Sequence, residues 1–137
     1  MIRHRTVQPF VVASAVLVSV SCAGSALAPA DLQLVVRNRS SDSVAFLAFD
    51  REASNLVSPN PGPLTVRTFG TNVAAPGKTV TTRGSAIDGF RVGADVRLFL
   101  YRVVGGQATF ATTFDVLASQ FLLPAHVIDL PMLASVP

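Results

Sequence analysis

The stretch DVRLFLYRV, residues 95–103, decides the fold of this chain. Its apolar side chains alternate between the two faces of an extended strand, with Val96, Leu98 and Leu100 on one face and Phe99, Tyr101 and Val103 on the other. Gly105-Gly106 follows, and glycine adopts the positive backbone angles of a tight turn without a Cβ clash. Residues 108–116 read as a partner strand, which predicts a central β-hairpin.

Short runs of similar composition flank this hairpin and are bounded by turn residues. They are residues 32–39, 44–50, 64–69, 79–83 and 126–130. Polar residues separate the first two runs, so we expect these runs to pair as a second hairpin. Seven short strands without a strong amphipathic helix predict an all-β antiparallel sandwich of immunoglobulin-like or transthyretin-like topology.

Breaker residues interrupt this pattern between the strands. Three prolines lie in residues 58–63, and proline has no amide donor and a fixed φ, so we expect a stiff surface loop there. Pro76-Gly77 predicts a turn before the threonine-rich strand 79–83. Residues 116–123 are expected to bend into a short helix before Pro124.

Three patterns of turn and strand residues cover much of residues 31–137. They are VxNRSSDSV at 36–44, APGKT at 75–79 and GxDVRLFLY at 93–101. Together they resemble small sandwich domains of bacterial envelope proteins. Because these patterns are turns and strands, the resemblance implies a fold and no particular activity.

The first 30 residues have the composition of an export signal. After Arg3 and Arg5 the next charged side chain is Asp31. The apolar run 10–20 lies between Arg5 and Asp31. A secretory signal has a basic start, an apolar segment of about 7 to 15 residues and small residues at its cleavage site. We therefore expect residues 1–30 to direct export and residues 31–137 to form one domain, periplasmic or on the outer surface.

Cys22 is the only cysteine, so no internal disulfide is possible. The sequence SVSC at 19–22 resembles the lipobox of bacterial lipoproteins, and this resemblance implies a lipid at Cys22 and a membrane tether. Two alternatives stay open. Cleavage after Ala28 or Ala30 would give a soluble secreted domain. Retention of the uncharged stretch 6–30 would give an anchor, since about 20 helical residues span a bilayer.

The charge balance argues against nucleic acid as a partner. The whole chain carries a net charge of +3, but two of its arginines belong to the signal, which leaves 9 basic and 8 acidic residues. Phosphate binding depends on clustered Lys and Arg side chains, and the mature domain is nearly neutral. We therefore expect no nucleic-acid partner.

No constellation of residues demands catalysis. His126 is the only histidine beyond the signal, Glu52 is the only glutamate, and no GxSxG motif is present. Metal sites need several His, Cys, Asp or Glu side chains that converge. We expect no enzyme, no metal site and no cofactor.

The sequence therefore favours a structural or interaction module of the cell envelope that docks on a larger membrane or periplasmic assembly. Strands that are apolar on both faces must be covered on both, and a two-sheet domain of this size covers only one. The candidates for an exposed patch that binds a protein partner are Phe46, Phe49, Phe99 and Tyr101, with packing in the core as the favoured alternative for each of them. Pairing at a sheet edge is a second route to the same kind of partner.

The alternative function is small-molecule or carbohydrate binding by loops at one end of the sandwich. The candidate loops are residues 58–63 and 83–91, with Arg83, Asp88 and Arg91 as polar contacts. Sugar sites often stack a ring on an aromatic side chain. The chain has no Trp and a single Tyr, which weakens this alternative.

Overall fold

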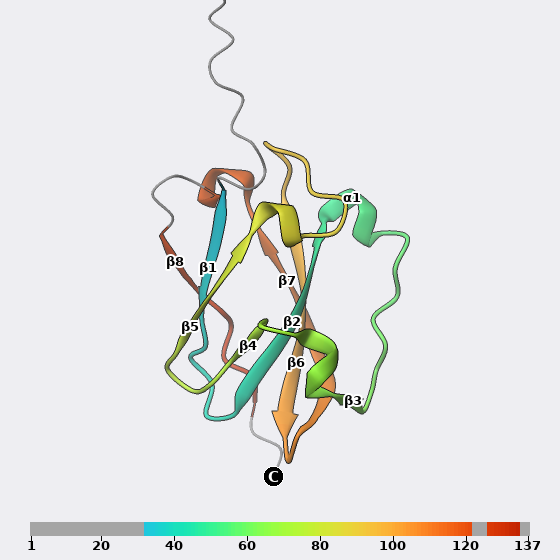
Figure 1. The fold of residues 1–137 in the computed structure, drawn as a ribbon, viewed down its shortest axis with the longest axis vertical. Helices are drawn as coiled ribbons and strands as arrows, with labels where there is room; N and C mark the ends of the chain where they lie inside the picture. Colours follow the sequence, from blue (N-terminus) through green and yellow to red (C-terminus); the bar gives the residue numbers. More distant parts are fainter. Residues whose placement is uncertain (1–31, 122–125, 135–137) are drawn as a thin grey trace, which may run out of the picture.

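A computed structural model describes residues 32–121 and 126–134 of the chain. Their strands form two sheets that face each other, which confirms the predicted all-β sandwich (Figure 1). One sheet has the strand order β5-β1-β8 and the other has the order β3-β7-β6-β2-β4. The strands are β1 (Gln33–Arg37), β2 (Ser43–Asp50), β3 (Leu64–Thr65), β4 (Val73–Ala74), β5 (Thr79–Arg83), β6 (Val96–Val104), β7 (Gln107–Val116) and β8 (Val127–Asp129).

Short helices lie in the connections between these strands. They are α1 (Arg51–Ser54) and the 3-10 helices η2 (Val66–Phe69), η3 (Gly84–Ala86) and η4 (Ala118–Gln120). The helix η4 lies within the segment expected to bend into a helix before Pro124.

The central hairpin is the predicted one. The strands β6 and β7 are antiparallel from Val96↔Val116 to Val104↔Gln107, and both glycines of the connecting turn have positive φ. The register shifts once beyond Leu100, where Ala111 is the extra residue of a β-bulge.

The second expected hairpin is wrong, because β1 and β2 belong to different sheets. The chain passes from one sheet to the other at Asn38. Its buried amide donates to the carbonyls of Asp42 and Ala74, and its Oδ1 accepts from the amide of Ser40. The strand β1 pairs with β5 and also, in parallel, with β8, which is the one departure from the antiparallel pattern among the described strands.

The run 64–69 is a strand only over its first two residues and then winds into η2. This turn brings Phe69 onto the aromatic ring of Tyr101, with 4.9 Å between the ring centroids. Burial of Phe69 thus outweighs the β-propensity of the run.

The core between the sheets is formed by the inward side chains of both. Leu34 and Val36 of β1 face Phe46 of β2 and Leu98 and Leu100 of β6, and all five are fully buried. This side of β6 is the even-numbered face predicted from the sequence.

The other face of the five-stranded sheet holds a second apolar cluster. Phe99 and Tyr101 are buried there with Phe69, and Phe49 and Phe110 pack against them half-buried. The connection from α1 to β4, which includes η2, covers this face as an additional layer (Figure 1).

The expected exposed patch is therefore corrected by the structure. Phe46 lies in the core between the sheets, Phe99 and Tyr101 are buried on the opposite face, and only Phe49 is partly accessible. The expectation assumed two layers, and the covering segment between β2 and β4 supplies a third.

Candidate functional site

The structure separates the two loops that were expected to form one ligand site. Residues 84–95 lie beside α1 at one end of the sandwich (Figure 1). Residues 58–63 run away from α1 to β7, where Pro61 accepts a hydrogen bond from the amide of Phe110. A ligand at one end of the domain would therefore not contact both loops.

The three expected polar contacts have different surroundings. Arg91 lines a cleft of about 390 Å³ at the α1 end. Asp88 pairs through its backbone with Ala48 and Asp50, and its side chain is exposed. Arg83 is exposed at the end of β5 and does not line this cleft.

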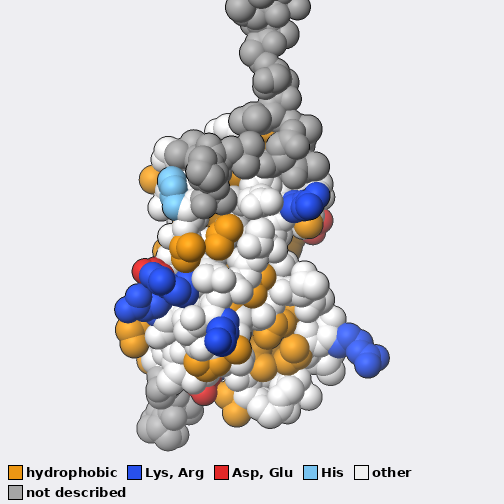
Figure 2. Space-filling view, turned by 60° about the vertical axis from the view of Figure 1, so that its left-hand side comes forward, with side chains coloured by type: hydrophobic (Ala, Val, Ile, Leu, Met, Phe, Trp, Pro, Cys, Tyr) orange, Lys and Arg blue, Asp and Glu red, His pale blue; other side chains and the backbone are white. Residues whose placement is uncertain are grey.

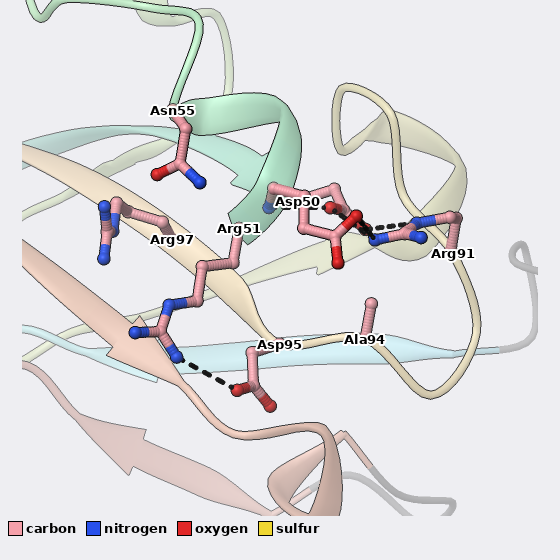
Figure 3. A pocket seen from close by; sticks show the side chains of 8 residues that line it. Asp50, Arg51, Asn55, Arg91, Ala94, Asp95 and Arg97 are labelled. Atoms are coloured by element: carbon pink, nitrogen blue, oxygen red, sulfur yellow. Dashed lines mark hydrogen bonds and ion pairs between the residues drawn. The ribbon is translucent and has the colours of Figure 1, made fainter.

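Asp50 organises the cleft, and its side chain is only 2% exposed. It caps α1 by accepting hydrogen bonds from the amides of Glu52 and Ala53, as expected of an aspartate at a helix N-terminus. Arg91 reaches the same carboxylate from the loop before β6, with two contacts of 3.1 Å (Figure 3). Arg91 also pairs with Glu52 at 2.9 Å.

The other side of the cleft is a second group of ion pairs. Arg97 of β6 binds Asp115 of β7 through two hydrogen bonds, and these residues are cross-strand partners. Arg51 extends to Asp95 (Figure 3) and also to Asp115, at 3.5 Å each. Asp95 in turn accepts a hydrogen bond from the amide of Ala118 at the start of η4.

The bound arginines lower the pKa of the carboxylates they contact. The hydrogen bonds from Arg91 hold the pKa of Asp50 below its ordinary value, although burial opposes this shift. Arg97 lowers the pKa of Asp115 in the same way. These carboxylates are therefore charged at neutral pH and poorly suited to serve as general bases.

Ion pairs and hydrogen bonds around the cleft thus link α1, the loop before β6 and η4. Each of its arginines contacts at least one carboxylate, so a charged ligand would have to displace an existing partner. These ion pairs therefore hold together the segments at this end of the sandwich, which indicates a structural role.

A second concave site lies along the hairpin of β6 and β7. It has a volume of about 460 Å³ and is lined by Arg102, Val104, Gln107, Thr109, Phe110 and Ala111. Arg102 is largely buried, and its Nε has no hydrogen-bond acceptor among the described residues, since Asp42 Oδ2 lies 3.6 Å away. The groove therefore offers the apolar side chains of Val104, Phe110 and Ala111, and Arg102 at its side forms an ion pair with Asp42.

The edge of β7 next to this groove is unpaired over residues 111–116. The strand β3 pairs only with Gln107 and Ala108, and no other strand in residues 32–121 and 126–134 pairs with this edge. Side chains of Thr109, Ala111 and Thr113 are exposed along it. Such an edge is a template for adding a strand from another chain.

Neither a cluster of metal ligands nor a membrane-spanning helix is found in the described residues. No three His, Cys, Asp or Glu side chains of residues 32–121 and 126–134 are placed to hold a metal ion. Within the same residues, His126 is exposed and makes no hydrogen bond or ion pair, and no helix is long and apolar enough to cross a membrane. Cys22 lies outside the described residues.

Charged side chains on the described surface do not form a basic patch on the face that Figure 2 shows. The Lys and Arg side chains there form small separate groups with uncharged surface between them (Figure 2), and Arg37 and Arg39 are neighbours that both pair with Asp129. This distribution agrees with the nearly neutral composition of residues 31–137.

Sequence reasoning singled out Arg91 but missed its partner Asp50 and the pairs around Arg97. Asp50 did carry a signal, because an aspartate directly after a strand and two residues before Glu52 is typical of a helix start. The pairing of Arg97 with Asp115 follows only from the register of the hairpin. Comparison with protein-family models, curated proteins and solved structures finds no match.

Proposed function

We propose that this chain is a non-catalytic structural or interaction module of the cell envelope, tethered to a membrane by a lipid on Cys22. It would lie in the periplasm or on the outer surface and dock on a larger membrane or periplasmic assembly. The unpaired edge of β7 carries this proposal, because it offers free backbone groups beside an apolar groove.

The partner would present an extended segment that adds a strand to β7. Backbone hydrogen bonds would supply affinity, and the groove at the bulge would supply selectivity for the side chains.

The tether is tested by the intact mass of the mature protein isolated from its native envelope. A mass that begins at Cys22 and includes a diacylglycerol supports it. A mass that begins near Asp31 would instead make the domain a free secreted one.

The docking edge is tested by cross-linking in the native envelope. A photoreactive residue at Ala111 should give a defined protein adduct that disappears when Thr113→Lys is added, because a lysine on an edge opposes strand addition. The matched control places the probe and the lysine on β5, one of the two outer strands of the other sheet, where Thr81 is exposed. Equal adducts from both edges, or no effect of Thr113→Lys, would contradict the proposal.

Small-molecule or carbohydrate binding is the competing proposal. The separation of the two candidate loops and the compensated charges around Asp50 give it less support than the edge of β7 gives to a protein partner.

A further inference from the structure

Exposed large apolar side chains gather at one end of the sandwich. Among the described residues seven such side chains are exposed. Four follow α1, lie in the loop before β6 or directly precede η4: Leu56, Val57, Val92 and Leu117. Val127 is the first residue of β8 and pairs with Val35 of β1. The other two lie elsewhere: Val104 is the last residue of β6, beside the turn to β7, and Met132 follows β8.

Val92 lies in the loop before β6 and Leu117 directly follows β7, and the pair Val96↔Val116 places both at the same end of the sandwich. Each is about half exposed, at 50% and 53%. Their segments are fastened together. Phe90 stacks on Phe121 with 5.1 Å between ring centroids, and Asp95 accepts a hydrogen bond from the amide of Ala118. Val92 and Leu117 therefore belong to two segments that are held together by these contacts.

The described chain begins at this same end. Leu32, which precedes β1, accepts a hydrogen bond from the amide of Gly84 at the start of η3, and η3 leads into the loop that carries Val92. Cys22 stands only 10 positions before Leu32, so a chain of that length reaches at most about 35 Å.

That reach is comparable with the size of the domain, since about 100 folded residues have a radius of gyration of about 13 Å. Placing the opposite end on the membrane would require the linker to run fully extended along the whole domain. The short linker therefore favours an orientation with the α1 end toward the bilayer.

We infer that the end formed by α1, the loop before β6 and η4 rests on the bilayer that holds Cys22, with Val92 and Leu117 in the interfacial layer. This inference rests on the proposed tether. Three of the arginines at this end, Arg51, Arg91 and Arg97, are paired with carboxylates, so we assign the contact to the apolar side chains. Two apolar side chains are enough for this contact, because the lipid on Cys22 already holds the domain at the bilayer and makes the contact intramolecular.

The absence of tryptophan from the chain permits a direct test. Val92→Trp, Leu117→Trp and the control Val104→Trp each create a protein with a single tryptophan, and Val104 is exposed at the opposite end. The full chain is isolated from membranes and reconstituted into phosphatidylcholine vesicles with and without brominated acyl chains. Flotation measures the tether, and quenching of tryptophan fluorescence measures depth.

The inference predicts that all three variants float with the vesicles. Emission from Val92→Trp and Leu117→Trp should shift to the blue and be quenched by the brominated lipid, while emission from Val104→Trp should be unaffected. Adding phosphatidylglycerol should leave the quenching unchanged.

Two failures are distinguishable. If the protein floats but the Val92→Trp and Leu117→Trp variants are quenched no more than Val104→Trp, the orientation is wrong and the tether stands. If the protein does not float, the tether is refuted and the orientation with it. Quenching that requires phosphatidylglycerol would contradict an apolar contact.

Discussion

At the scale of single residues, Asp50 connects the fold to its end surface. One carboxylate terminates β2, caps α1 and holds Arg91, so three segments depend on it. Its pKa lies below the ordinary value because of the hydrogen bonds from Arg91. A carboxylate with a lowered pKa stabilises the folded state above the pKa of the unfolded chain, and this contribution is lost as the pH falls through the folded value.

Asp50→Asn should therefore destabilise the protein at pH 7 by about 1–2 kcal/mol, since the hydrogen bonds to charged Arg91 are weakened. The difference from the wild type should begin to shrink as the pH falls below the ordinary aspartate pKa of about 3.9, and it should be lost as the pH passes through the lower pKa of the folded carboxyl. Urea unfolding at several pH values measures both effects.

The matched control for this prediction is Asp88→Asn. Asp88 is exposed and its side chain makes no ion pair among the described residues, so its loss should change stability by less than about 0.5 kcal/mol. A difference between wild type and Asp50→Asn that persists unchanged into acid would contradict the assigned ion pair.

At the scale of elements, most strands could be predicted from local pattern, but their partners could not. The glycine turn and the alternation of apolar side chains around Phe99 and Tyr101 were enough to predict the central hairpin. The course of the chain after β1 depends on Asn38, whose amide bonds Ala74 from a distant segment. No pattern within residues 32–50 contains that information, which is why a hairpin was expected there.

The candidate site was predictable to a smaller degree for the same reason. Arg91 could be singled out as a loop residue, but its contact with Asp50 joins positions 41 residues apart. Burial of Phe99 and Tyr101 likewise depends on η2, which the strand-like composition of 64–69 concealed. Sequence pattern reports local geometry, whereas sites and covered faces depend on tertiary contacts.

The proline-containing segment 58–63 gives an element-scale prediction through Gly62. Gly62 and Gly93 both have φ of +86°, so alanine at either position should cost about 1–2 kcal/mol of backbone strain. A Cβ at Gly62 would also lie 2.6 Å from the carbonyl oxygen of Ala108, whereas a Cβ at Gly93 would meet open space.

Gly62→Ala should consequently destabilise the protein by about 1–3 kcal/mol more than Gly93→Ala, because the segment can no longer pack against β7. Thermal unfolding of the two variants under identical conditions provides the comparison. Equal losses would show that the segment does not rest on β7 as described.

At the scale of the whole molecule, β2 and β6 serve both apolar clusters at once. Leu98 and Leu100 of β6 face the core between the sheets, while Phe99 and Tyr101 of the same strand face the covering segment. A strand cannot lose one of these faces without disturbing the other. The covering layer should therefore belong to the same cooperative unit as the sandwich.

The single tyrosine and the lack of tryptophan make this cooperativity measurable. Tyr101 fluorescence reports the outer cluster, and far-ultraviolet circular dichroism reports both sheets. The urea transitions measured by tyrosine fluorescence and by circular dichroism should have the same midpoint and slope. We expect this because the covering segment should leave Tyr101 only when β6 unfolds. A tyrosine transition at clearly lower urea would mean that the segment between β2 and β4 opens alone. In that case Phe99 and Tyr101 would become accessible while the sandwich remains folded. These two residues of the candidate patch would then be exposed in a partly opened state of the protein.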